Sequence, residues 1–168
     1  MLEDRLQPME ESYKTGFQLL KRRNYDAAIT FFRQKLEEGT PQAHALAHYG
    51  LATAIYQQKQ NTLTREEVRE IISHYETSIS QDPDFADAYV LCSVAYDRLA
   101  MTFIEQGKTD ASLRTTVLAN ARKALTTARN HLAKALELNL KLANTAAQYL
   151  ASYNSTENTI LAVEKFKD

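Results

Sequence analysis

The stretch from Ser12 to Pro41 constrains the fold of this chain more than any other feature. Apolar residues recur at helical spacing on both sides of a tight turn at Arg23-Asn24, so the stretch predicts two short amphipathic helices. Asn24 can cap the second helix. Gly39 is a natural C-terminal stop, and Thr40 can cap a third helix that begins at Pro41.

The same arrangement recurs twice further along the chain. Gly16 aligns with Gly50 and Ser93, where a small residue lets paired helices cross closely. The second helices of the three units align as Tyr25, Val68 and Leu125; Ala28, Ile71 and Ala128; Phe32, Tyr75 and Leu132; and Leu36, Ile79 and Leu136. Aromatic residues at Phe32 and Tyr75 are expected to fill the space between consecutive units.

Local signals mark where the later helices begin and end. Thr64 and Glu67 form a capping box, and Leu63 with Val68 forms a hydrophobic staple, so a helix should begin there and end at Asp82-Pro83. The remaining helices are expected at about 41–60, 84–107, 110–138 and 140–153. The tail after Asn154-Ser155-Thr156 is expected either to dock as a short helix or to fray.

The repeated unit resembles the tetratricopeptide repeat over about residues 9–153. That family has a 34-residue unit with small residues at its eighth and twentieth positions, an aromatic at the twenty-fourth and usually Pro at the thirty-second. The segments 25–29 (YDAAI) and 133–139 (AKALELN) are close to the family's wording, and Asp82-Pro83 matches its closing turn. Ile71, where the family has Ala, and Leu140, where it has Pro, depart from the pattern.

The resemblance implies an all-α fold, a right-handed α-solenoid of antiparallel helix pairs in a single domain, 1–168. The expected divisions are repeat one at 9–40, extended repeat two at 41–83, extended repeat three at 84–139, a capping helix at 140–153 and a C-terminal tail at 154–168. Gly50 to Pro83 exceeds the family's spacing by 9 residues, and Ser93 to Leu140 exceeds it by 23. Repeats two and three should therefore have elongated helices, with a long loop as the competing interpretation.

Composition points to a non-secreted globular protein. The net charge is −1, so no overall field recruits nucleic acid or membrane. The single Cys92 excludes an intramolecular disulfide and is expected in the core. The N-terminus lacks the apolar run of a signal peptide, and no stretch is long and apolar enough for a membrane span. We expect a cytoplasmic protein.

No catalytic or metal-binding motif stands out. His44 and His48 have the i, i+4 spacing of half a metal site, but HALAH lacks the Glu of HExxH and no nearby ligand completes a site. They are expected in the groove or on the surface, while His74 and His131 are expected to be exposed. No phosphate-binding loop or catalytic triad is recognisable, so we expect neither an enzyme nor a cofactor.

The resemblance implies a concave groove lined by the first helix of each unit. The matching positions give the candidate partner-binding residues Tyr13, Phe17, Leu20, His44, Ala47, Leu51, Val90 and Val94. Phe17, Leu51 and Val94 share one position, so they would form an apolar strip able to accept an amphipathic helix or apolar peptide. The strip could equally be covered by the chain's own tail, a neighbouring helix or a second copy.

The sequence bears on two other modes of recognition. The helix expected at 110–138 carries three basic residues on one side, namely Arg114, Arg122 and Arg129. This basic face could dock nucleic acid or an acidic partner, or its arginines could instead pair with acidic neighbours in the same protein. A C-terminal EEVD-type chaperone ligand is not expected, because the family's clamp positions hold Tyr13, Phe17, His48, Asp87 and Leu91 here. The sequence therefore favours a non-catalytic scaffold, adaptor or assembly factor that binds a protein or peptide. The alternatives are homo-oligomerisation through the strip and nucleic-acid docking on the basic helix.

Overall fold

The structure, a computed structural model, describes residues 11–38 and 41–166, and these residues are helical with short connections and no strand. The expected start of repeat one at residue 9 and the turn at Gly39-Thr40 lie outside the described residues. The chain divides into two compact units, Met1–Leu91 and Cys92–Asp168. The single domain expected from the sequence stays a prediction.

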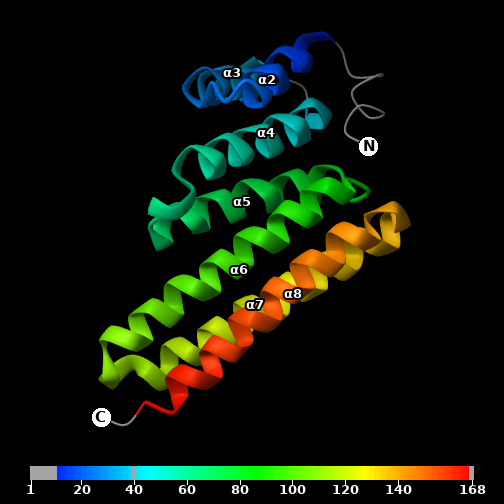
Figure 1. Cartoon of the computed structure of the whole chain (residues 1–168). Coiled ribbons are helices and arrows are strands. Elements are labelled where there is room, and N and C mark those ends of the chain that lie inside the picture. Colours follow the sequence, from blue (N-terminus) through cyan, green and yellow to red (C-terminus); the bar gives the residue numbers. More distant parts are fainter. Residues whose placement is uncertain (1–10, 39–40, 167–168) are drawn as a thin grey trace. The chain divides into compact units, whose positions relative to one another are not determined.

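The N-terminal unit contains α2 to α5 and the first residues of α6 (Figure 1). The bounds are α2 Glu11–Lys21, α3 Tyr25–Glu38, α4 Pro41–Lys59 and α5 Arg65–Gln81, with a 3-10 turn at Gln60–Thr62. The predicted turn at Arg23-Asn24 is confirmed. Arg23 has a φ of 59°, and backbone bonds from Arg23 and Asn24 to Leu20 and Leu19 close the end of α2.

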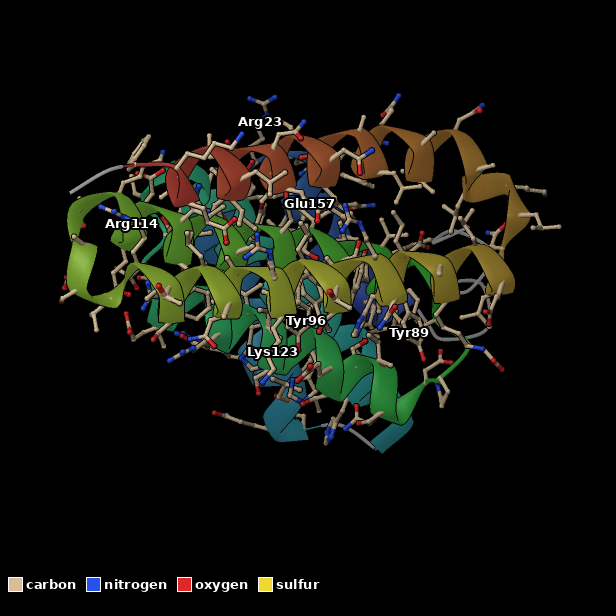
Figure 2. All side chains as sticks on the ribbon, turned by 90° about the horizontal axis from the view of Figure 1, so that it is seen from below. Arg23, Tyr89, Tyr96, Arg114, Lys123 and Glu157 are labelled. Carbon is tan, nitrogen blue, oxygen red and sulfur yellow. The ribbon has the colours of Figure 1, made fainter. Side chains whose placement is uncertain are left out.

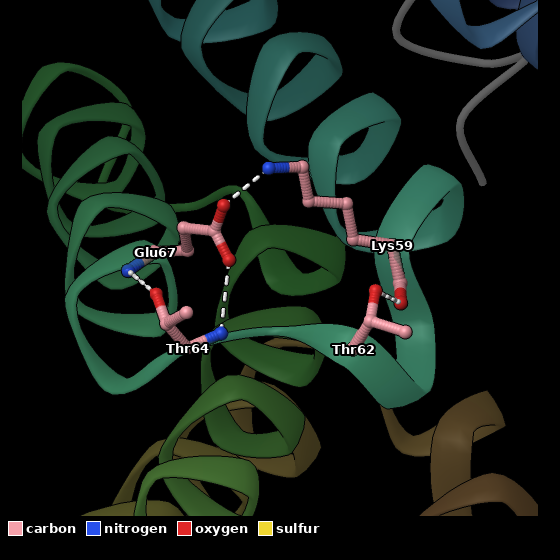
Figure 3. Close-up of polar contacts among 4 residues, drawn as sticks. All are labelled: Lys59, Thr62, Thr64 and Glu67. Atoms are coloured by element: carbon pink, nitrogen blue, oxygen red, sulfur yellow. Dashed lines mark hydrogen bonds and ion pairs between the residues drawn. The ribbon is translucent and has the colours of Figure 1, made fainter.

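The predicted capping box at the start of α5 is confirmed. The Thr64 hydroxyl accepts a hydrogen bond from the Glu67 amide at 3.2 Å, and the Glu67 carboxylate accepts one from the Thr64 amide at 2.9 Å (Figure 3). Lys59, at the end of α4, also donates to the Glu67 carboxylate. These hydrogen bonds, with Lys59 the largest cause, lower the pKa of Glu67. Both residues of the predicted staple, Leu63 and Val68, are buried.

One aromatic ring fills the centre of the N-terminal unit. Phe32 on α3 has no exposed surface, and the glycines of α2 and α4 make room for it. A Cβ built on Gly16 would lie 2.6 Å from Phe32 Cζ, and one on Gly50 would lie 2.2 Å from it. The small residues predicted for close helix crossing therefore accommodate a ring at these two positions.

The C-terminal unit contains three long helices. They are α6 Ala86–Thr109 (24 residues), whose first residues belong to the N-terminal unit, α7 Arg114–Leu138 (25 residues) and α8 Ala143–Glu164 (22 residues), with 3-10 turns at Ala111–Leu113 and Leu140–Leu142. The chain turns from α6 into α7 within a few residues, so the lengthening comes from helix and the long-loop alternative is wrong. Tyr96 stacks on His131 with ring centroids 5.4 Å apart, which joins α6 to α7.

The helix predicted at 140–153 is longer than expected. It continues through Asn154-Ser155-Thr156, so Ile160, Leu161 and Val163, which lie in the stretch assigned to a tail, belong to α8. Ile160 and Val163 are buried, while Leu150 is 39% exposed. The continuation has a tertiary cause, because Thr156 on this stretch is buried and donates to Asp97 on α6.

Candidate binding site

A pocket of about 440 Å³ opens between α2 and α4 in the N-terminal unit. Its lining residues are Lys14, Phe17, Gln18, Leu20 and Lys21 from α2, and Tyr49 and Thr53 from α4. Phe17, Leu20 and Tyr49 supply apolar surface. Lys14, Gln18 and Lys21 are exposed and supply polar groups at its edge. The pocket thus combines an apolar floor with a rim that carries two cationic side chains.

Aromatic packing holds the floor of this pocket in place. The Phe17 ring lies 5.3 Å from Phe32 and 6.1 Å from Tyr49, measured between ring centroids. Tyr49 in turn lies 6.0 Å from Tyr75 and 4.8 Å from Phe85. Since Tyr75 and Phe85 are buried, the exposed part of Phe17 sits on a cluster that is continuous with the core.

Hydrogen bonds fix the polar side of the same wall. The Thr53 hydroxyl donates to the Tyr49 carbonyl oxygen at 2.7 Å, one helical turn back, and its oxygen lies 3.1 Å from the Tyr75 hydroxyl. Tyr75 belongs to α5, so this contact ties the pocket wall on α4 to the next helix. Within the part of the chain that the structure describes, every residue that lines the pocket therefore belongs to α2 or α4.

The structure separates the candidate groove residues into two groups. Five are buried, although Leu20 among them still contributes to the pocket wall: Tyr13, Leu20, Ala47, Leu51 and Val90. Phe17, His44 and Val94 keep partly exposed side chains. Phe17 and Leu20 line the pocket. Val94 belongs to the C-terminal unit and Leu51 is only 3% exposed, so a continuous strip through Phe17, Leu51 and Val94 stays a prediction.

The candidates from the sequence included Phe17 and Leu20 but missed the other lining residues, which are Lys14, Gln18, Lys21, Tyr49 and Thr53. Tyr49 and Thr53 are both buried. Their one-turn spacing on α4, opposite Phe17 on α2, was the available signal. It could not be used without knowing which faces of the two helices meet.

The histidines of α4 lie near a third histidine on α5. His48 Nδ1 is 2.8 Å from His74 Nδ1, and His44 Nε2 is enclosed without a hydrogen-bond partner. Burial, together with the charges of His74 and His44, lowers the pKa of His48 to about 4. Within residues 11–38 and 41–166, no three His, Cys, Asp or Glu side chains gather closely enough to hold a metal ion.

The three arginines of the predicted basic face all donate to the C-terminal end of the chain. Arg122 makes two bonds to Glu164, at 2.5 and 2.8 Å, and Arg129 bonds Glu157 at 2.6 Å. Arg114 donates to the Phe166 carbonyl at 3.0 Å. Glu157 lies on the side of α8 that faces α7 (Figure 2). The interpretation that these arginines pair with acidic neighbours therefore fits Arg122 and Arg129, whereas Arg114 donates to the carbonyl oxygens of Gly107 and Phe166.

A signal for this pairing was present in the sequence. Arg122 and Arg129 are seven residues apart, and so are Glu157 and Glu164. Two antiparallel helices with charges at a shared seven-residue spacing bring both pairs together. Glu157 and Glu164 were overlooked because they lie in the stretch that was taken for a tail.

A partly buried polar cluster joins α6 to α8 in the C-terminal unit. Asp97 accepts hydrogen bonds from Thr156 at 2.8 Å and Ser152 at 3.3 Å. Burial raises the pKa of Asp97, while the bonds from Thr156 and Ser152 and the charge of Arg129 oppose that rise. Cys92, on the same helix, is fully buried, which confirms its predicted place in the core.

Comparison with known protein families and with curated proteins found no match. The tetratricopeptide resemblance therefore remains a prediction based on the residues that carry it. None of the helices in the described part of the chain is both long enough and apolar enough to cross a membrane.

Proposed function

We propose that this protein is a non-catalytic protein-interaction module that binds an amphipathic helix or peptide in the pocket between α2 and α4. The observation that carries the proposal is the pocket itself, about 440 Å³, with Phe17, Leu20 and Tyr49 presenting apolar surface. A pocket with an aromatic floor and a polar edge suits a large apolar side chain that comes from a partly polar segment. The tetratricopeptide resemblance supports the same use of these helices.

The positive charge at the rim of the pocket indicates which charge a binding peptide should carry. Lys14 and Lys21 lie seven residues apart on α2, hence on one side of it, and both line the pocket. A peptide with a carboxylate beside its apolar anchor would gain from these cations, whereas a basic peptide would be repelled. The preferred ligand is accordingly an acidic, amphipathic segment of another protein.

The test blocks the pocket from its rim without touching the core. Gln18→Trp places a large ring at an exposed lining position of α2, and Thr15→Trp places the same ring at an exposed position of α2 that does not line the pocket. Affinity capture with the wild type supplies partners, whose purified binding segments are then titrated against each variant. We expect Gln18→Trp to weaken binding at least tenfold and Thr15→Trp to leave it unchanged. Equal binding by both variants contradicts the proposal.

A second candidate function is self-association, for which α8 offers a specific surface. Leu150 is 39% exposed and Leu161 45% exposed. They lie eleven residues apart, which is about 20° on a helical wheel, so they share one face of the helix. A second copy of α8 in antiparallel orientation would bring each Leu150 against the other Leu161. Light scattering at several concentrations decides this, because a dimer that Leu150→Gln with Leu161→Gln dissociates supports it and a monomer throughout rejects it.

A further inference from the structure

Two histidine rings meet where α4 packs against α5 in the N-terminal unit. The two Nδ1 atoms of His48 and His74 are 2.8 Å apart, and the ring centroids are 5.1 Å apart at an interplanar angle of 33°. Nitrogen atoms at this distance share a hydrogen bond, so one Nδ1 donates a hydrogen and the other accepts it. The two neutral rings must therefore be opposite tautomers, one protonated on Nδ1 and the other on Nε2.

The groups around the pair mostly disfavour positive charge. On α4, His44 lies one turn before His48 and acts against its protonation. On α3, Arg33 acts against protonation of His74, while Glu70 on α5 favours it. Burial is the largest influence on both rings. It lowers the pKa of His74 as well as that of His48, so both rings are neutral at pH 7.

Counting protons shows which state of the pair breaks the contact. The first added proton can go to the free Nε2 of the donor ring, and the hydrogen bond between the Nδ1 atoms survives. A second proton has to go to the accepting Nδ1. Two N–H groups then face each other with no acceptor between them, and two positive charges lie beside Arg33. The doubly protonated pair cannot keep its 2.8 Å separation.

We propose that the His48–His74 pair is an acid-sensitive contact that holds α4 against α5 and opens when both rings are protonated. The unfolded chain takes up protons near pH 6.5, whereas the folded pair resists them until about pH 4 in the case of His48. The unfolded state therefore binds more protons between these values. The contribution of the pair is complete above about pH 6.5 and is lost as the pH falls towards 4.

The contact reaches the binding pocket through the next residue on each helix. Tyr49 follows His48 and lines the pocket, and Tyr75 follows His74. The Thr53 hydroxyl, 3.1 Å from the Tyr75 hydroxyl, connects the two helices at the pocket wall. Separation of α4 from α5 would thus deform this wall and weaken ligand binding in acid. This last step rests on the proposed function, whereas the acid-sensitive contact does not.

Nitrogen NMR of the histidine rings in the wild-type chain tests the contact directly, with a chelator present to exclude metal. We expect two of the four histidines to show opposite tautomers at pH 7.5 and to titrate below 6.5, His48 near pH 4. The amides of Tyr49 and Thr53 should shift with the lower of the two midpoints, at which the second proton breaks the contact. Four rings that all titrate near 6.5 would overturn the proposal. Histidine titration without movement of those amides would overturn only the link to the pocket.

Thermal unfolding between pH 7.5 and 5 supplies the second test. We expect the wild-type melting temperature to fall over this range, and His48→Gln with His74→Gln to abolish more than half of the fall. His131→Gln is the matched control, because His131 lies on α7 with its Nδ1 3.0 Å from the Thr127 carbonyl oxygen and its ring against Tyr96. The His131→Gln variant should keep the wild-type dependence of melting temperature on pH. The same slope in all three proteins contradicts the proposal, whether or not the pocket binds a peptide.

Discussion

The hydroxyl of Tyr153 donates a hydrogen bond to the Ser93 hydroxyl oxygen across 2.7 Å, inside the C-terminal unit. Tyr153 on α8 is 1% exposed and Ser93 on α6 is fully buried. Ser93, a small residue singled out by its alignment with Gly16 and Gly50, thus serves as a buried polar partner of Tyr153. This bond is one of the contacts that make the whole of α8 part of the fold.

Removal of that bond gives the first prediction. Tyr153→Phe keeps the ring and loses the donor, so we expect the free energy of unfolding to fall by about 1 kcal/mol. Tyr149→Phe, a half-buried tyrosine one turn earlier on α8, is the control and should change stability little. Urea unfolding of the three proteins measures the difference. An equal loss in both variants would show that the Ser93 contact contributes nothing specific.

The ring of Phe32 and the glycine opposite it form a coupled pair. Gly50→Ala places a methyl group where Phe32 Cζ already lies, so we expect a loss of about 1–3 kcal/mol from overpacking. Phe32→Leu removes part of the ring and makes room. The double variant should therefore lose less than the sum of the single changes, by at least about 0.5 kcal/mol. If the losses measured by urea unfolding are strictly additive, the Phe32 ring moves aside freely and the two positions are not coupled.

The ion pairs between α7 and α8 should contribute only modestly to the free energy of unfolding. Arg122 and Glu164 have 41% and 38% of their side chains exposed, so solvent and salt screen their attraction. A double-mutant cycle with Arg122→Gln and Glu164→Gln should give a coupling of about 0.2–1 kcal/mol at low salt. We expect the coupling to shrink in 1 M sodium chloride. A coupling that is large and independent of salt would contradict a screened surface pair.

Asp97 gives a pH dependence of the opposite sign to that of the histidine pair. Burial raises its pKa above the ordinary 3.8, so the folded protein holds a proton that the unfolded chain releases. Its contribution to stability is complete below the unfolded value and is lost as the pH rises through the folded pKa. Relative to the wild type, Asp97→Asn should therefore gain stability between pH 4 and pH 7.

Thermal unfolding of the two proteins across this range measures that gain. Asp84→Asn, at an exposed position, is the matched control and should show no such trend. A difference in melting temperature between Asp97→Asn and the wild type that stays constant across the range would contradict a raised pKa at Asp97.

Local chemistry explains why much of the fold was predictable. The Thr64–Glu67 capping box, the turn at Arg23 and the end of α5 near Pro83 depend on residues within a few positions of one another, so the sequence displays them directly. The length of α6 and α7 followed from the distance between Ser93 and Leu140. These features needed no knowledge of which helix lies beside which.

Contacts between distant residues account for what was missed. Asn154-Ser155-Thr156 looks like a break, but the buried Thr156 gains a hydrogen-bond partner in Asp97, which compensates its weak helix preference. The spacing between His44 and His48 is visible in the sequence, whereas the contact between His48 and His74 joins two different helices and is not. Leu51 was placed in an open groove by its repeat position and is instead buried. For Thr156 and His48 the deciding neighbour is more than twenty residues away.

The two arginine–glutamate pairs between α7 and α8 matter for alignment more than for strength. If α8 slid along α7 by seven residues, one arginine would still find a glutamate and the other would lose its partner. The observed register is the one that uses all four charges. Ion pairs that contribute little free energy can therefore still select one helix register among several similar ones. This selection matters for α8, because its many small alanine side chains distinguish poorly between registers.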